Sequence, residues 1–420
     1  MGQHRLPPNV FIGHDISGTT NMITVNEAQK IIADHLKIFP VSECPLEESY
    51  GAILREDIVA DRDQPSFDKV LMDGIAILYA SWQRGNRRFK IEGIQAAGQA
   101  PLRLKEVHAC IEAMTGAVLP EGTDCVIPVE EISVHSHEAV VNKEVQVVRM
   151  QNVLPVGVDY KQGTTLLKEG TMLLPPQVAV VASVGKATVR VSYKPKIAII
   201  STGDELVDIG VAAKPYQIRK SNSYALQAAL RHNGYFESLI FHIGDDRGQL
   251  LSEIGSILKT FDVVILSGGV SAGKFDFIPG VLKELGVAVL FHKVQQKPGK
   301  PFWFGMNQEG KAVFALPGNP ASTQICFYRY VLPQLNRSMG ISKISREFAS
   351  LAEDFSVKTP LTYFLTVTLE INPDGQLVVT PVAISGSGDY LALANSDGFV
   401  ELEANKGYFN AKSVVPLYRW

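Results

Sequence analysis

The strongest constraint on the fold is an alternation of apolar and amphipathic segments that begins at Lys196. Apolar runs such as KIAII, DVVIL and AVFAL are separated by stretches whose apolar residues recur at helical spacing, as in residues 247–260. Strands that are apolar throughout are buried on both faces, and their alternation with helices is typical of a doubly wound parallel sheet. Residues 191–340 are therefore predicted to form an α/β domain with a mostly parallel sheet.

The rest of the chain has a different pattern. Residues 61–160 contain short β-prone pieces separated by Gly, Pro and Asn, and residues 341–420 return to a β alternation, so both are expected to be β-rich. Residues 22–36 have apolar residues on one helical face, and Asn26 is the expected N-cap. Residues 1–21 show no apolar periodicity and are expected to be a mobile extension without function.

Composition excludes several classes of protein. With 40 basic and 43 acidic residues, the net charge of −3 argues against a broad nucleic-acid-binding face. No apolar run approaches the roughly 18 residues of a membrane span, and the N-terminus lacks the apolar block of a secretory signal. The 4 cysteines are far apart and form no CxxC pair, so neither a zinc site nor a disulfide framework is expected. We therefore expect a cytoplasmic protein.

Glycine-containing loops follow the apolar strands of the α/β segment. They are STGDE at 201–205, GDD at 244–246, SGGVSAGKFD at 267–276 and LPGNP at 316–320. In such sheets ligands bind beyond the carboxyl ends of the strands. Glycine lets backbone N–H groups approach an oxyanion closely, and a following helix N-terminus adds positive partial charge. These loops therefore predict a binding site for a phosphate-containing ligand.

Several of these loops also carry acids, although any one acid could merely cap the next helix. Acids at neighbouring strand ends together favour a divalent cation, and oxygen ligands suit magnesium, with Glu205, Asp245 and Asp276 as the expected ligands. Residues 268–274 almost spell a P-loop. Phe275 stands where that motif needs Ser or Thr, which disfavours an ordinary P-loop ATPase.

A basic loop follows the α/β strands. Lys293, Lys297 and Lys300 bracket Pro298, and held lysines suit a compact tetrahedral dianion because each acts as a point charge. The alternative is a solvated basic loop, which the flanking prolines and aromatic residues disfavour.

Motifs along the chain resemble one family when they are taken in order. They are PSFDKVLMDGIA, AMTGAVLPEGTDCVI, STGDEL, LSGGVSAGKFDF, KPGKPFWFG, LPGNPAS and GSGDYLALAN. This ordered set resembles the molybdopterin molybdenumtransferases of the MoeA type, which share it with the C-terminal region of gephyrin. The resemblance implies an enzyme that inserts molybdenum from molybdate into adenylylated molybdopterin and releases AMP.

The resemblance also implies an architecture. A split N-terminal domain would comprise residues 22–60 and 161–190, with the β-rich module 61–160 inserted into it. The α/β domain 191–340 would bind molybdopterin, and a small β-barrel-like domain would follow at 341–420. Members of the family are homodimers whose active cleft lies between the α/β domain of one subunit and the inserted module of the other.

The resemblance also implies which residues of this chain are functional, position by position. Those expected in catalysis are Asp73, Thr115, Asp159, Glu205, Asp245 and Asp276. Those expected to bind substrate are Gly268, Gly269, Ser271, Gly273, Lys293, Lys297, Pro317 and Pro320. By their local sequence alone, Asp73, Thr115 and Asp159 would be read as turn residues.

The chain departs from the family pattern at Lys69–Leu71 and Ile75, beside the MDG motif, and at Lys220, where the family has an acid. Alternative functions are a non-catalytic molybdopterin-binding scaffold, a molybdopterin adenylyltransferase and a generic nucleotide hydrolase. Other enzymes of the molybdopterin pathway and molybdoenzyme acceptors are the expected partners, besides a second copy of the chain.

Overall fold

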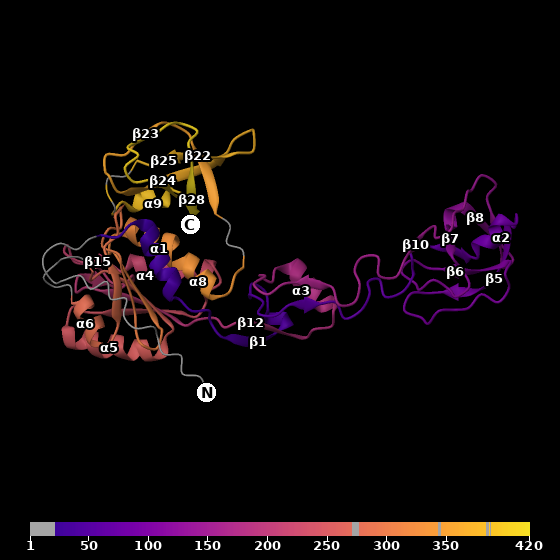
Figure 1. The fold of residues 1–420 in the computed structure, drawn as a ribbon, viewed down its shortest axis with the longest axis horizontal. Coiled ribbons are helices and arrows are strands. Elements are labelled where there is room, and N and C mark those ends of the chain that lie inside the picture. Colours follow the sequence, from indigo (N-terminus) through magenta and orange to yellow (C-terminus); the bar gives the residue numbers. More distant parts are fainter. Residues whose placement is uncertain (1–21, 271–276, 343–345, 384–385, 387) are drawn as a thin grey trace. The chain divides into compact units, whose positions relative to one another are not determined.

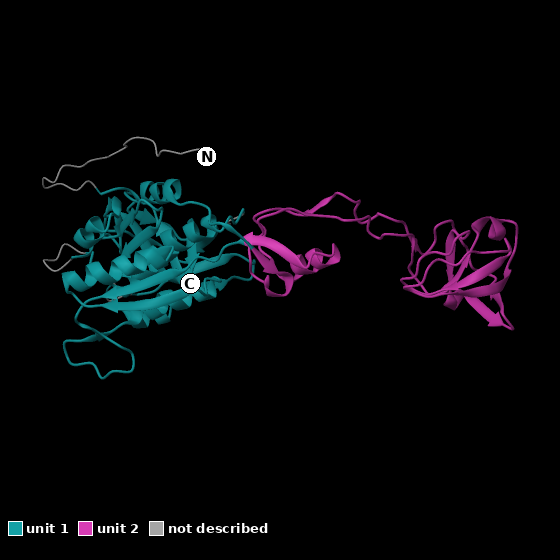
Figure 2. Ribbon diagram, turned by 90° about the horizontal axis from the view of Figure 1, so that it is seen from below, with its two compact units in different colours: residues 1–42, 192–420 teal, residues 43–191 magenta. Residues whose placement is uncertain are grey.

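A computed structural model describes residues 22–270, 277–342, 346–383, 386 and 388–420. The predicted site residues Ser271, Gly273 and Asp276 lie outside the described residues. The chain forms two compact units, which comprise residues 1–42 with 192–420 and residues 43–191 (Figure 2). We call them unit 1 and unit 2.

Unit 2 contains a 6-stranded sheet with the strand order β7-β4-β6-β5-β9-β8. Its strands are β4 (Gly74–Ile77), β5 (Arg88–Gln95), β6 (Ala109–Ala113), β7 (Cys125–Pro128), β8 (Ile132–His135) and β9 (Glu138–Val141). Alternate residues such as Ile75, Ile77 and Phe89 pack with the short helix α2 (Tyr79–Gln83) into one core. Most neighbouring strands are antiparallel, while β5 and β6 are parallel.

Shorter elements complete this part of the chain. They are β1 (Val41–Pro45), η1 (Leu46–Glu48), β2 (Ile58–Val59), β3 (Lys69–Val70), η2 (Val129–Glu131), β10 (Val153–Leu154), β11 (Thr165–Leu167), α3 (Pro175–Ser183) and β12 (Thr188–Ser192). Antiparallel pairing joins β2 to β11 and β3 to β10. Each pair therefore brings together segments that are far apart in the sequence.

Unit 1 contains the predicted α/β domain, in which strands and helices lie together (Figure 1). Its 6-stranded sheet has the order β16-β13-β17-β21-β20-β18. Its strands are β13 (Ile197–Thr202), β16 (Ser238–Ile243), β17 (Val263–Ser267), β18 (Ala288–His292), β20 (Trp303–Met306) and β21 (Ala312–Leu316). The strands from β16 to β21 run parallel, and only β20 is antiparallel to its neighbours. The prediction of a mostly parallel sheet is confirmed.

Helices and a two-stranded ribbon connect these strands. They are β14 (Leu206–Val207), β15 (Ile218–Arg219), α4 (Ser221–His232), α5 (Arg247–Thr260) and α6 (Ile278–Glu284). Helix α5 begins where the Asp246 side chain accepts the Gln249 N–H at 2.8 Å, and Leu250, Ile254 and Ile257 then face the sheet. Asp246 is therefore an N-cap.

Helix α1 (Val25–His35) precedes both units' sheets in the sequence and belongs to unit 1. Its N-cap is Thr24, and the prediction of Asn26 was wrong. The Thr24 hydroxyl accepts from the Glu27 N–H at 3.2 Å, and the Glu27 carboxylate accepts from the Thr24 N–H at 2.7 Å. This reciprocal capping box satisfies free N–H groups at the helix start, which a cap at Asn26 would leave unpaired.

The last helix of the α/β domain changes its winding. It runs from α7 (Pro320–Cys326) through the π-helical segment η3 (Phe327–Val331) into α8 (Leu332–Ser338). Arg329 in η3 is 5% exposed, and its Nε lies 2.6 Å from the Glu401 carboxylate. Its guanidinium also donates to the Gln29 side chain at 2.9 Å. One buried arginine thus links α1, η3 and the C-terminal domain.

The C-terminal domain is a barrel. Its elements are β22 (Glu347–Leu351), β23 (Phe355–Ser356), β24 (Thr362–Ile371), β25 (Leu377–Pro381), α9 (Tyr390–Ala394), β26 (Gly398–Leu402), β27 (Tyr408–Phe409) and β28 (Val414–Arg419). The order β24-β25-β22-β28-β26 closes because β24 also pairs with β26. A further strand, β19 (Gln296–Lys297), extends β24 in parallel. The barrel-like fold expected for this segment is confirmed.

None of the helices within the described residues combines the length and apolar character needed to span a bilayer.

Candidate functional site

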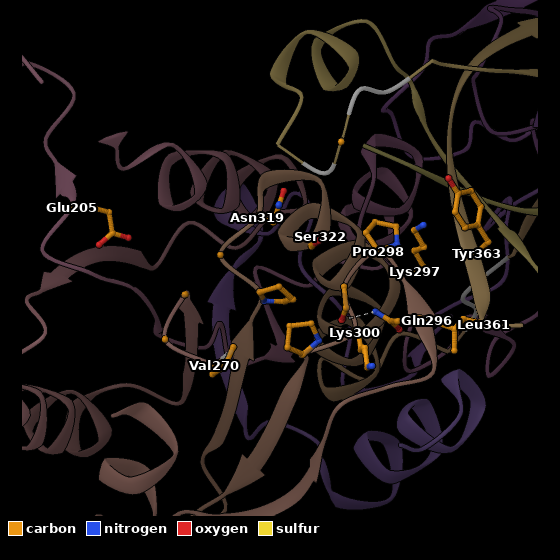
Figure 3. A pocket seen from close by; sticks show the side chains of 17 residues that line it. Glu205, Val270, Gln296, Lys297, Pro298, Lys300, Asn319, Ser322, Leu361 and Tyr363 are labelled. Carbon is orange, nitrogen blue, oxygen red and sulfur yellow. Dashed lines mark hydrogen bonds between the residues drawn. The ribbon is translucent and has the colours of Figure 1, made fainter. Parts of the chain in front are cut away.

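The loops after the parallel strands of unit 1 surround a cavity of about 950 Å³. Figure 3 shows the residues that line it. Most come from the turns after β13 (Glu205), β17 (268–270) and β21 (317–319), and from the basic loop 296–301. The others are Ser322 in α7, Leu361 just before β24, Tyr363 in β24, and Gly386. Cavities of this size accommodate nucleotide-sized ligands. The cavity thus lies beyond the carboxyl ends of the parallel strands, where the sequence predicts a binding site.

The turn after β17 is built on glycines. Gly268 and Gly269 have φ values of +99° and +70°. A Cβ on Gly269 would lie 2.6 Å from Cγ1 of Ile278 and 2.9 Å from Oγ1 of Thr202. Oγ1 of Thr202 is buried and has no hydrogen-bond partner among the described residues. Backbone at this turn can approach a ligand more closely than any side-chain-bearing residue would allow.

Asn222, near the start of α4, holds two of these loops together. Its amide nitrogen donates to Oγ of Ser267 at 2.9 Å and to the carbonyl oxygen of Gly318 at 2.8 Å. The sequence motifs do not single out Asn222. Its bridging role depends on pairings between distant segments, which no local pattern reveals.

Glu205 is exposed and lines the cavity. The turn before Glu205 contains Gly203, whose φ is +134°. A Cβ added at this position would lie 2.4 Å from a Glu205 carboxylate oxygen, so the close approach requires glycine. Magnesium is commonly bound by one or two carboxylates together with substrate phosphates. The exposed Glu205 carboxylate beside a glycine turn fits that mode of binding.

Asp245 does not line the cavity. Its backbone N–H donates to the Asp204 carboxylate at 3.1 Å, and the Asp204 N–H donates to the Asp245 carboxylate at 3.4 Å. These reciprocal bonds join the loops after β13 and β16. Within the described ranges, no group of His, Cys, Asp and Glu side chains has the arrangement of a metal site.

The basic loop contributes Lys297 and Lys300 to the cavity, whereas Lys293 is absent from its lining. Lys297 and Lys300 are exposed and have no ion-pair partner among the residues that the structure describes. The buried Gln296 side chain fixes this loop to the domain core. It donates to the Gly299 carbonyl at 3.1 Å and accepts from the buried Tyr330 hydroxyl. Among the described residues, the two lysine charges in the cavity therefore have no ion-pair partner, and the loop that carries them is held by Gln296.

Both predicted prolines flank the loop after β21. Pro317 lines the main cavity, and Pro320 begins α7. Pro320 lines a smaller adjoining pocket of about 100 Å³, which shares Glu205 and Gly268 with the main cavity.

Lys220 immediately precedes α4 and is 7% exposed. Its ammonium lies 2.9 Å from the Asp208 carboxylate, and this hydrogen bond is the main reason that the pKa of Asp208 is below its ordinary value. The lysine thus fastens the loop between β14 and β15 to the start of α4.

Unit 2 brings together two of its three predicted site residues. The backbone N–H and the hydroxyl of Thr115 both donate to one Asp73 oxygen at 2.7 Å. These donors hold the pKa of Asp73 below its ordinary value, so it is a carboxylate at neutral pH. Asp159 is exposed in a separate turn, where its N–H donates to the Gln64 carbonyl at 2.9 Å.

Comparison with known families covers nearly the whole chain. Residues 23–185 match the MoeA N-terminal region (domain I and II), and residues 198–337 match a probable molybdopterin binding domain. Residues 349–420 match the MoeA C-terminal region (domain IV).

Individual relatives agree with this assignment. A molybdopterin molybdenumtransferase of Synechocystis is 39% identical over 95% of this chain and 100% of its own length. One from Staphylococcus epidermidis is 31% identical over 94% of this chain and 95% of its own. The crystal structure of a Pyrococcus horikoshii molybdopterin biosynthesis MoeA protein has a TM-score of 0.82 at 31% identity, and the match covers 95% of this chain and 99% of that one.

Proposed function

The chain belongs to the MoeA family of molybdopterin molybdenumtransferases, and from that premise we propose that its reaction takes place in the cavity of unit 1. The protein is a transferase of molybdenum cofactor biosynthesis that inserts molybdenum. In the proposed reaction molybdate supplies the metal, adenylylated molybdopterin accepts it, and AMP is released. The observation that carries the proposal is one cavity that combines a glycine turn, an exposed carboxylate and uncompensated lysines.

The glycine turn binds the pyrophosphate. The backbone N–H of Gly269 approaches its oxygens, because neither glycine has a side chain in the way, while the Gly268 N–H donates to the Leu316 carbonyl at 3.1 Å and holds the turn in place. Glu205 would hold magnesium, which when bound neutralises charge on the phosphoryl oxygens. Asp245 acts through Asp204 to fix the neighbouring loop. The roles predicted from the sequence for Ser271 and Gly273 in binding the pyrophosphate, and for Asp276 as a further magnesium ligand, belong to the same proposal, although these residues lie outside the described ones.

The basic loop binds molybdate. The ammonium groups of Lys297 and Lys300 attract the dianion, and Lys293 supports the same loop and its charge. Two reactants held in one cavity gain rate from proximity and orientation, so no protein nucleophile is needed. Pro317 and Pro320 limit the freedom of the loop that borders the substrate.

We further propose that the protein acts as a cytoplasmic homodimer. In this arrangement Asp73, Thr115 and Asp159 of one copy complete the cavity of the other, as the family resemblance implies. Asp73 is ionised and is held in place by Thr115. Its carboxylate can therefore accept hydrogen bonds from donor groups of the substrate and position them. The same proposal includes domain boundaries at residues 60, 160, 190 and 340. It also includes other enzymes of the molybdopterin pathway and molybdoenzyme acceptors as partners.

The test is release of AMP from adenylylated molybdopterin by the purified full chain. Release that depends on molybdate supports insertion, whereas release without molybdate indicates a nucleotide hydrolase. Absence of turnover indicates a scaffold, and formation of adenylylated molybdopterin from ATP indicates an adenylyltransferase. The variant Lys297→Ala should raise the KM for molybdate. Lys283→Ala is the matched control, because this exposed lysine at the end of α6 does not line the cavity.

Glu205→Gln and Asp276→Asn test the phosphate end of the cavity. Both should lower molybdate-dependent AMP release. Full activity in both variants and in Lys297→Ala would contradict the assignment of this cavity as the reaction site.

A further inference from the structure

Tyr363 belongs to the barrel but borders the cavity of the α/β domain. Strand β24 pairs in parallel with β19, and this register places Tyr363 opposite Lys297. Figure 3 shows Tyr363 beside Lys297 and Pro298, at the opposite end of the cavity from Glu205. Nothing in the sequence motifs singles out this tyrosine, because its position is set by pairing between two distant segments.

The Tyr363 ring is fixed while its hydroxyl is unused. The ring packs on Phe355 with centroids 6.0 Å apart and an interplanar angle of 30°. Its hydroxyl has no hydrogen-bond partner among the described residues. Burial raises the pKa of Tyr363, so the phenol keeps its proton at neutral pH and can donate it.

The two ends of the cavity differ in chemistry. Glu205 is the only carboxylate that the described lining contains, and it lies at the glycine end. The other end presents the ammonium group of Lys297 beside Tyr363, while Lys300 lines the cavity with its side chain directed away from Tyr363 (Figure 3). A fully deprotonated tetrahedral oxyanion has only hydrogen-bond acceptors, so this set of donors matches it.

We propose that Tyr363 is a substrate-binding residue that donates its hydroxyl hydrogen to the tetrahedral oxyanion held by Lys297. Naming that oxyanion as molybdate rests on the proposed function. Lysine is a compact charge on a flexible stem and orients an anion weakly. A phenol on a paired strand supplies direction, and therefore selects one orientation of the oxyanion relative to the glycine end.

Tyr363→Phe tests this role, because it removes the hydroxyl and keeps the ring. Equilibrium dialysis with molybdate alone should show binding to the full chain that is about 10- to 100-fold weaker, the consequence of losing a hydrogen bond to a charged acceptor. In turnover, the KM for molybdate should rise while the KM for adenylylated molybdopterin stays unchanged. A merely structural role for the tyrosine would not produce this split.

Tyr408→Phe is the matched control. Tyr408 also lies in the barrel, but its hydroxyl donates to Asp354 at 2.5 Å and it does not line the cavity. Molybdate binding should be unchanged in this variant, although loss of the bond to Asp354 should lower its thermal unfolding midpoint. Tyr363→Phe should keep the wild-type midpoint, because its hydroxyl has no partner among the described residues to lose.

Lys297→Ala separates this inference from the proposed function. If Lys297→Ala weakens molybdate binding and Tyr363→Phe does not, the role of Tyr363 is refuted and the proposed site stands. If neither substitution changes molybdate binding, both the role of Tyr363 and the proposed oxyanion site are refuted. Weaker binding in both variants, with Tyr408→Phe unaffected, supports the inference.

Discussion

Replacing Gly269 with alanine should damage both the stability and the phosphate end of the cavity. The φ value of +70° costs an L-residue about 1–2 kcal/mol. The new Cβ would also lie 2.6 Å from Cγ1 of Ile278 and 2.9 Å from Oγ1 of Thr202, and overpacking of this kind costs about 1–3 kcal/mol. Together the structure predicts a loss of about 2–5 kcal/mol.

The protein can reduce this cost only by moving the turn. A shifted turn would take the backbone away from the phosphates that we propose it binds, so AMP release should fall more than binding of molybdate alone. Gly280→Ala is the matched control, because Gly280 lies in α6 without a positive φ, and a Cβ there would meet no atom within 4 Å. Alanine there should stabilise the helix by up to about 1 kcal/mol and leave activity unchanged.

Chemical denaturation and the AMP-release assay, applied to both variants, decide the matter. If Gly269→Ala unfolds at the wild-type denaturant concentration and releases AMP at the wild-type rate, the steric reasoning about this turn is refuted. Equal destabilisation by Gly280→Ala would also refute it, because the cost would then come from losing glycine in general.

Further predictions concern a cap, a carboxylate and a buried ion pair. Asp246→Ala should destabilise α5 by about 1 kcal/mol in chemical denaturation while AMP release persists, since this side chain caps a helix outside the cavity. Thr115→Val should raise the pKa of Asp73 toward its ordinary value in a carboxyl ¹³C NMR titration, because one of two donors is lost. A lowered pKa stabilises the fold above the unfolded-state pKa, and this contribution disappears as pH falls through the folded-state value, so the variant should lose less stability on acidification. Arg329→Met should cost about 3–5 kcal/mol in denaturation, because it leaves the Glu401 carboxylate, itself 17% exposed, without its cation.

The sequence predicted those parts of the fold whose signals are local. The predicted range 247–260 matches α5, because Asp246 caps its start and apolar residues recur at helical spacing along its length. The parallel sheet followed from runs such as KIAII, since full burial requires residues that are apolar throughout. At α1 the local signal was present but misread, because Thr24 and Glu27 form the S/T-x-x-E pattern of a capping box.

Features that depend on tertiary pairing could not be predicted. The π-helical segment Phe327–Val331 is one such feature. The ion pair between Arg329 in this segment and the distant Glu401 is another, because it joins residues that are far apart in the sequence. In the site, the glycine turns and Lys297 were predicted from their motifs. Tyr363 and Asn222 were missed, because one is placed by strand pairing and the other by bonds to two separate loops.

The pairing of β19 with β24 has a consequence for protein engineering. Because the basic loop is itself an edge strand of the barrel, the α/β fold and the barrel do not exchange as independent modules. A chimera that takes its barrel from a relative must take residues 296–301 from the same parent, or the hybrid will present its lysines in the wrong register. Cutting the chain before β24 would likewise strip the basic loop of its neighbour and leave an open β edge prone to aggregation.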